Sequence, residues 1–213
     1  MKSKRQLQSL PAKIRIAKRV LGHMNNIGTL SIETERLLFR RFEYSDCGSM
    51  LRNWVADANV QLNYGEPVYS TEDEVKRLLD KYIAGYQRDD FYRWAIIDKA
   101  SNECAGQIAF FLVDSKNHFA EIEYCIGTGF QKCGYATEAT KAIISYGFGK
   151  IGLHKVQICV RPVNQSSRRV IEKCGFTYEG TLRDYFFKDD HYEDRMYFSI
   201  LQREYLEKTG RGK

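Results

Sequence analysis

Two carboxylates, Glu121 and Glu123, are placed where they could accept a proton. They alternate within the segment EIEYCIG, whose β-branched and aromatic residues and period of two predict a strand. Alternation puts both side chains on the same face of that strand. One of them could take a proton from an amine, directly or through water. A solvated face, or ion pairs with neighbouring strands, would explain the same pattern.

A glycine-punctuated loop follows these carboxylates and leads into a predicted amphipathic helix that begins near Ala136. The free backbone N–H groups and the positive dipole end of such a helix start favour a phosphate or pyrophosphate. The loop is not a P-loop, because Gly134 is followed by Tyr135 instead of Lys and Ser or Thr. It also lacks the dinucleotide fingerprint, since Lys132 stands where the third glycine belongs and no acid follows about 20 residues on.

Three stretches together resemble the GNAT N-acetyltransferases, and in particular the RimJ/RimL-type branch that acetylates ribosomal-protein N-termini. Residues 131–136 read Q-x-x-G-x-A, which is similar to the acyl-CoA pyrophosphate loop of the family. Residues 164–176 resemble the branch's segment N-x-x-S-x-x-V-x-E-K-x-G-F, and residues 33–42 resemble its opening strand. The stretches occur in the family's order and roughly at its spacing, and the likeness covers residues 31 to about 205.

The resemblance implies that acetyl-CoA is the co-substrate and that backbone N–H groups of the loop and helix start bind its pyrophosphate. It also implies main-chain pairing of the pantetheine with the end of the preceding strand. The chain departs from the family at one point, where glycine and then a basic residue are usual and this chain has Lys132 and then Cys133. The expected cofactor-binding residues are Cys125, Ile126, Gln131, Lys132, Cys133, Gly134, Tyr135, Ala136, Thr137 and Asn164.

Acetyl transfer from a thioester to an amine requires a bound donor, a polarised carbonyl, a deprotonated amine and a hydrogen-bond or proton donor for the departing thiolate. We predict Glu123 as the base, because it lies nearer the strand end that leads into the cofactor loop. Glu121, Asp184 and Glu66 are the alternatives. Such acids would also attract a cationic amine.

Many GNAT enzymes place a tyrosine near the leaving thiolate, on the helix that follows the strand predicted over residues 154–160. This chain has no tyrosine there, and the resemblance instead maps Ser167 as the donor to the CoA sulfur. Ser167 would equally serve in the first turn of a helix, and Asn164 as its N-cap. No cysteine nucleophile is indicated, because no histidine is placed to orient one.

The chain has 213 residues, 43% hydrophobic and 13% aromatic, which suits one folded domain. Its net charge of +6 is uneven. Residues 1–29 hold seven of the 33 Lys and Arg residues and none of the 27 Asp and Glu residues, which leaves 26 basic against 27 acidic side chains. We therefore predict a basic extension over residues 1–29, a catalytic domain over 30–206 and a short tail over 207–213.

The six cysteines form no C-x-x-C pair and the four histidines are scattered, so no metal site is predicted. Dispersed thiols are typical of reduced, cytoplasmic proteins. The N-terminal residues have no uninterrupted apolar core of a signal peptide. No stretch approaches the roughly 20 apolar residues of a membrane span. We expect no membrane partner.

The predicted order of elements is β-α-α-β-β-β-α-β-α-β-β, which implies an α+β fold with a mixed, mostly antiparallel sheet flanked by helices, the order that the resembled family shows. The expected strands cover residues 37–42, 92–98, 104–113, 120–126, 154–160, 177–188 and 192–201. The expected helices cover residues 45–55, capped by Ser45 or Asp46, 71 to about 88, from about 136, and 164–175. Residues 63–67 are expected to form a loop.

The sequence predicts an acetyl-CoA-dependent N-acetyltransferase whose acceptor amine attacks directly in a ternary complex. The acceptor would be a protein N-terminus, for example that of a ribosomal protein, or a small-molecule amine such as a polyamine or an amine-bearing antibiotic. The alternative is a non-catalytic module that binds acyl-CoA or RNA, with residues 1–29 contacting RNA or the ribosome. The expected assembly is a monomer or homodimer.

Overall fold

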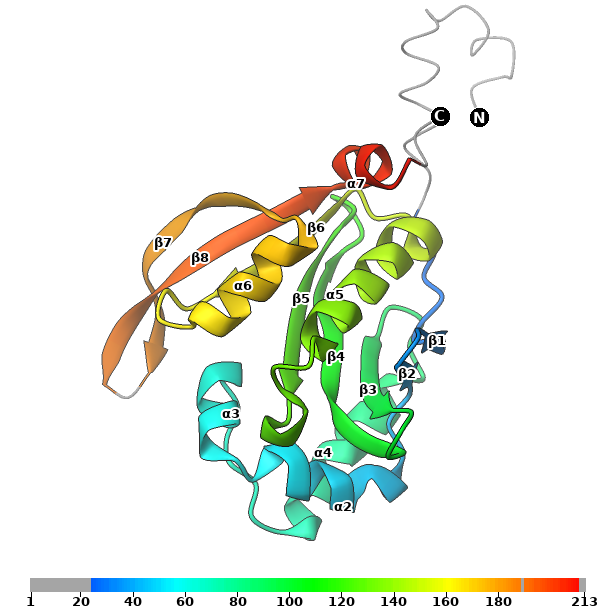
Figure 1. Ribbon diagram of the computed structural model, residues 1–213, viewed down its shortest axis with the longest axis vertical. Helices are drawn as coiled ribbons and strands as arrows, with labels where there is room; N and C mark the ends of the chain where they lie inside the picture. Colours follow the sequence, from blue (N-terminus) through cyan, green and yellow to red (C-terminus); the bar gives the residue numbers. More distant parts are fainter. Residues whose placement is uncertain (1–23, 189, 211–213) are drawn as a thin grey trace, which may run out of the picture.

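Strand β5 (Phe119–Ile126) lies inside a mixed sheet in the computed structural model, which describes residues 24–188 and 190–210 (Figure 1). Within these residues the sheet has eight strands in the order β1-β2-β3-β4-β5-β6-β8-β7. Neighbouring strands are antiparallel except β5 and β6, which run parallel. The remaining strands are β1 (Ile32–Glu33), β2 (Leu37–Arg40), β3 (Tyr92–Asp98), β4 (Glu103–Asp114), β6 (Lys155–Val160), β7 (Thr177–Lys188) and β8 (His191–Leu201).

Helices cover both faces of the sheet, with α5 and α6 on one side and α2 and α4 on the other (Figure 1). Side-chain caps mark several helix starts: Thr71 accepts from the Glu74 N–H at α4, and Asp57 accepts from the Asn59 N–H at α3. The helices are α2 (Cys47–Met50), α3 (Ala58–Tyr64), α4 (Glu72–Gly85), α5 (Tyr135–Tyr146), α6 (Gln165–Cys174) and α7 (Gln202–Thr209).

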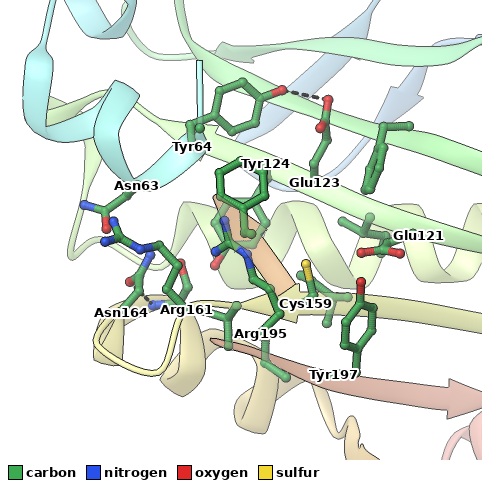
Figure 2. Close-up of a pocket in the computed structure, with 18 of the residues that line it drawn as sticks. Asn63, Tyr64, Glu121, Glu123, Tyr124, Cys159, Arg161, Asn164, Arg195 and Tyr197 are labelled. Atoms are coloured by element: carbon green, nitrogen blue, oxygen red, sulfur yellow. Dashed lines mark hydrogen bonds between the residues drawn. The ribbon is translucent and has the colours of Figure 1, made fainter. Parts of the chain in front are cut away.

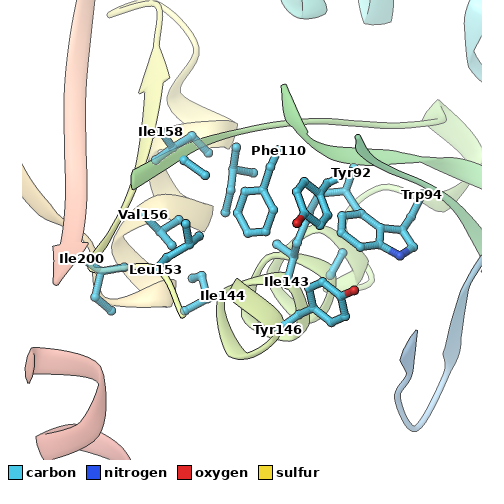
Figure 3. Close-up of a cluster of buried hydrophobic side chains, with 14 of the residues drawn as sticks. Tyr92, Trp94, Phe110, Ile143, Ile144, Tyr146, Leu153, Val156, Ile158 and Ile200 are labelled. Atoms are coloured by element: carbon cyan, nitrogen blue, oxygen red, sulfur yellow. The ribbon is translucent and has the colours of Figure 1, made fainter. Parts of the chain in front are cut away.

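Each face of the sheet has its own apolar core. The core beneath α5 and α6 includes aromatic side chains from β3, β4 and α5, which meet edge to face (Figure 3). Trp94 and Phe110 lie here, and both are almost fully buried. The second core packs α2 and α4 against the other face, around the fully buried Trp54. The two cores fix β5 from both sides, so its alternating side chains have defined directions.

The parallel pair β5 and β6 separates before either strand ends. Pairing runs from Phe119 opposite Lys155 to Ile122 opposite Ile158 and then stops. Strand β5 nevertheless continues to Ile126. Backbone groups at this end of β5 that face β6 therefore have no strand partner on that side, which leaves a gap through the sheet.

The structure confirms the α+β fold class and most predicted elements. The capping box of Thr71 and Glu74 and the left-handed Gly175 at the end of α6 are both present. The single helix predicted over residues 45–55 is wrong: a 3-10 turn (Tyr44–Asp46), α2 and a π-helical turn (Leu51–Val55) replace it. Neither predicted cap holds its N-terminus, because the Asp46 carboxylate accepts from Arg40 and from the Glu43 N–H instead.

One strand and two α-helices among the described residues were not predicted. Strand β1 forms one edge of the sheet, and helix α7 directly follows β8. Helix α3 was missed because its seven residues carry too weak a periodicity, and its end overlaps the loop predicted over residues 63–67.

The described start of the chain contacts the domain. Thr29 is buried and its hydroxyl donates to the Phe91 carbonyl, and Tyr146 donates to the Gly28 carbonyl. Residues 1–23, which hold the basic side chains of the predicted extension, and residues 211–213 of the predicted tail lie outside the described residues. Between residues 24 and 210, no described helix is long and apolar enough to cross a membrane.

Candidate active site

A cavity of about 400 Å³ lies at the gap between β5 and β6 (Figure 2). Side chains reach it from α3, β5, β6, α6 and the β7–β8 hairpin. The register of the hairpin breaks between Leu182 and Phe186, and Tyr185 and Phe186 of this irregular stretch line the cavity. The polar residues that line it include Tyr64, Glu121, Glu123, Tyr124, Cys159, Arg161, Asn164, Ser167, Arg195 and Tyr197.

Glu123, the predicted base, is held by two neighbours. Its carboxylate forms an ion pair with Arg93 at 2.5 Å and accepts a hydrogen bond from the Tyr64 hydroxyl at 2.7 Å. Arg93 also donates to Gln107 and to Tyr64, and its side chain is only 13% exposed. Burial raises the pKa of the Tyr64 hydroxyl well above its ordinary value, although the positive charge of Arg93 partly opposes this rise. Glu123 is therefore the centre of a semi-buried charge network.

Glu121 has neutral surroundings. It is 4% exposed, and its carboxylate accepts from the Gln157 side chain at 2.6 Å. Among the described residues it forms no ion pair. Burial, and then the neighbouring Glu121, raises the pKa of the Cys159 thiol to about 12. Figure 2 shows Tyr197 on the same side of the cavity as Glu121, across from Arg161 and Asn164.

The N-terminus of α5 has no side-chain cap, unlike those of α3, α4 and α6. Gly134 precedes the helix with φ of +91°, a left-handed conformation that glycine adopts without strain. The first backbone bond runs from the Glu138 N–H to the Gly134 carbonyl. The N–H groups of Tyr135, Ala136 and Thr137 therefore have no acceptor within the helix, which suits an anionic group. This end fits the predicted pyrophosphate of CoA.

The side chains predicted around this loop mostly hold its shape. Gln131 donates to the Ile126 carbonyl, and the Tyr135 hydroxyl donates to Asp98 at 2.6 Å. Lys132 is exposed and has φ of +63°. The Cys133 thiol donates to the Phe130 carbonyl at 2.8 Å.

Arg36 is a further cation at this loop, which the site prediction missed although it lies in the opening stretch of the resemblance. It donates to the Cys133 carbonyl at 2.8 Å and forms an ion pair with Glu138 of α5. Its guanidinium lies 4.9 Å from the ring centroid of Tyr135. These contacts fix the glycine loop to the start of β2.

Ser167 and Asn164 meet at the start of α6, on the side of the gap that faces α5. The Asn164 side chain accepts from the Ser167 N–H at 3.1 Å, so the predicted N-cap is present. Ser167 also lines the cavity and lies beside the Tyr124 hydroxyl. Burial raises the pKa of Tyr124 to about 12, although Ser167 lowers it somewhat. Tyr124 was missed, because its position on β5 places it in the apolar half of the alternation.

Other predicted residues lie apart from the cavity. Cys125 packs in the second core, and burial raises the pKa of its thiol to about 12. The alternative bases Glu66 and Asp184 are exposed and do not line the cavity. Arg93 was also missed, although it is the only internal charge in the apolar strand YRWAIID. The described residues contain no group of His, Cys, Asp and Glu arranged to hold a metal ion.

The uncapped helix N-terminus beside the end of β5, where the sheet splits, is the arrangement that the sequence predicted for an acyltransferase. Residues 36–177 match the acetyltransferase (GNAT) domain family. The chain is 31% identical over 176 residues to the uncharacterized N-acetyltransferase YnaD of Bacillus subtilis, which covers 83% of this chain and 99% of that protein. The protein belongs to the GNAT family and is an N-acetyltransferase.

Solved structures agree with this assignment. A GNAT-family acetyltransferase from Bacillus anthracis superimposes with a TM-score of 0.74 at 28% identity, over 82% of this chain and all of that chain. A spermidine N-acetyltransferase from Vibrio cholerae, solved with CoA and spermine, gives a TM-score of 0.69 at 26% identity, over 81% and 99% of the two chains.

Proposed function

We propose that the protein is an acetyl-CoA-dependent N-acetyltransferase of the RimJ/RimL type, in which a primary amine attacks directly in a ternary complex. The observation that carries this proposal is the split between β5 and β6, with an uncapped helix N-terminus on one side and a buried carboxylate on the other. Acetyl-CoA supplies an activated acetyl thioester. The free N–H groups at the start of α5 bind its pyrophosphate, and the unpaired end of β5 binds its pantetheine.

We propose Glu121 as the group that accepts the amine proton. Its carboxylate lines the cavity, accepts from the neutral Gln157 side chain and forms no ion pair among the described residues, so no salt bridge has to break when an ammonium approaches. Glu123 was predicted for this role, but its ion pair with Arg93 argues for a positioning role at the acceptor end. The Ser167 hydroxyl, beside that of Tyr124, is the proposed donor to the departing thiolate.

The acceptor is a protein N-terminal amine or a small-molecule amine. The motif over residues 164–176 favours a protein N-terminus, whereas the relative from Vibrio cholerae is a spermidine acetyltransferase. A ribosome or RNA contact through residues 1–29 stays a prediction. All six cysteines are free, which supports a reducing, cytoplasmic setting.

Release of free thiol from acetyl-CoA tests this function. We expect turnover with at least one amine in a panel of peptides that start with alanine, a simple alkylamine and spermidine. Calorimetry should show CoA binding by the same protein. CoA binding without turnover of any amine would favour a non-catalytic module that binds acyl-CoA, and absence of CoA binding would contradict the proposed function.

A further inference from the structure

The cavity contains a cation that the acetyl-transfer reaction does not use. Arg195 of β8 lines it, and among the described residues this guanidinium forms no ion pair. It lies over the ring of Phe186, 4.6 Å from the ring centroid. A guanidinium stacked on an aromatic ring keeps its in-plane N–H donors available for a planar anion.

The local charges confirm that Arg195 is uncompensated. Glu193 lies two residues earlier on the same face of β8, and the positive charge of Arg195 is one of the influences that lower the pKa of its carboxyl. That carboxylate already accepts from Arg161, whose side chain is 14% exposed, and lies 3.4 Å from His191. Glu193 is thus already engaged by Arg161, and Arg195 has no ion-pair partner of its own among the described residues.

Arg195 lies on the acceptor face of the sheet. Cys159 pairs with Tyr197, so Arg195 shares a face with Tyr197, Cys159 and Glu121 through the two-residue alternation and the parallel register. Helices α5 and α6, and hence the free N–H groups for the cofactor, lie on the opposite face. An anion bound by Arg195 would therefore belong to the acceptor and not to CoA.

We propose that the preferred acceptor is an amine that also carries an anionic group, a carboxylate or a phosphate, which Arg195 binds while the amine approaches Glu121. This inference rests on the proposed function, since it concerns the second substrate of the same site. Figure 2 shows Arg195 and Glu121 at separate positions in the cavity, as a molecule with opposite charges at two points requires. Tyr185 and Phe186 provide an apolar wall beside the anion site.

Four peptide amides test the proposal in matched pairs: Ala-Glu against Ala-Gln, and Ala-phosphoserine against Ala-Ser. We expect kcat/KM to be about 10–100-fold higher for at least one acidic member than for its neutral partner, because a hydrogen-bonded ion pair forms only with the acid. The difference should lie mainly in KM. Preference for one acidic peptide over the other identifies the anion.

Arg195→Gln should bring the acidic-to-neutral ratio close to one. Arg183→Gln is the matched control, because Arg183 is exposed on β7, does not line the cavity and loses the same charge. Retention of the ratio in Arg195→Gln, or its loss in Arg183→Gln as well, would overturn the proposal. So would an equal fall in kcat on all four peptides, or a loss of CoA affinity in Arg195→Gln, since either places Arg195 elsewhere in the reaction.

A binding measurement separates this proposal from the proposed function. The N-acetylated forms of the same four peptides are titrated into the full chain by calorimetry, which needs no turnover. Tighter binding of an acidic member, lost in Arg195→Gln, supports the anion site even if no amine is acetylated. Equal binding of all four, or binding of none, contradicts it.

Discussion

The two sides of the gap between β5 and β6 differ in the chemical groups that line them. The cofactor side consists mainly of backbone N–H groups from one continuous segment, residues 131–138, whose side chains hold the loop. The acceptor side consists of side chains from α3, β5, β6 and the β7–β8 hairpin. On the proposed assignment, donor binding depends on local conformation, whereas acceptor choice depends on long-range pairing of charges.

Glu121→Gln tests the acceptor side most severely. We expect kcat at neutral pH to fall about 10²–10⁴-fold, because the group that accepts the amine proton is removed. The CoA affinity measured by calorimetry should not change. Activity should recover partly at high pH, where solvent deprotonates the amine. A variant with unchanged kcat and pH profile would exclude Glu121 as the base.

Glu123→Gln gives the contrasting result if the two carboxylates differ as their partners indicate. Arg93 would keep a largely buried positive charge without its carboxylate, so the free energy of unfolding should fall by about 3 kcal/mol. Urea denaturation measures this loss. Glu121→Gln, whose partner Gln157 is neutral, should lose less stability. If Glu123→Gln instead lowers kcat at full stability and recovers at high pH, Glu123 is the base.

Gly134→Asp tests the cofactor side. A carboxylate at the start of α5 would repel the pyrophosphate, and we expect CoA to bind about 100-fold more weakly or worse. Gly134→Asn is the matched control, because asparagine has the same shape, tolerates the left-handed conformation and carries no charge. Circular dichroism checks that both variants fold. Equal CoA affinities in the two variants would remove the charge argument.

Ser167→Ala should have a smaller effect, because Tyr124 remains beside the same point. We expect kcat to fall about fivefold, the equivalent of one neutral hydrogen bond. Ser166→Ala is the control: Ser166 is exposed, and its hydroxyl donates to the same Asn164 cap. If both variants lose activity equally, the effect comes from the helix cap and not from the thiolate.

Glu138→Gln tests whether the contacts of the Glu138 carboxylate stabilise the fold around the cofactor loop. Burial alone would raise the pKa of Glu138, but hydrogen bonds from Thr34 and Arg36 outweigh it and lower the pKa below its ordinary value of 4.5. The carboxylate therefore stabilises the fold above that pH, and the contribution is lost as the pH falls through the folded pKa. We expect a loss of about 1 kcal/mol at pH 7, because Arg36 is partly exposed, and a smaller deficit near pH 3.

Unfolding of wild-type and Glu138→Gln protein in urea at both pH values measures this effect. Glu172→Gln is the matched control, since its carboxylate pairs with Arg168 on an exposed face of α6. A deficit that is equal at pH 7 and pH 3 would contradict the anchoring role.

Features that depend on local interactions could be predicted from the amino-acid sequence alone. The loop before α5, the Thr71 and Asn164 caps and the closing Gly175 each join residues a few positions apart, so composition and spacing reveal them. The family resemblance likewise depends on short local motifs, and these are spread over most of the domain. The short helix α3 and the irregular turns of residues 44–55 were not predicted, because these segments are stabilised by packing and show no clear periodicity.

The surroundings of each carboxylate, in contrast, depend on the folded arrangement of distant segments. Glu121 and Glu123 look alike in sequence, two positions apart on one predicted face. Folding brings Arg93 to Glu123, thirty positions away, and Gln157 to Glu121, thirty-six positions away. Arg195 likewise has no ion pair of its own among the described residues, because Glu193 is already paired with Arg161. The pKa of a charged side chain depends on the groups within a few ångströms of it. Strand pairing determines which groups come that close, and a local sequence pattern does not encode this pairing.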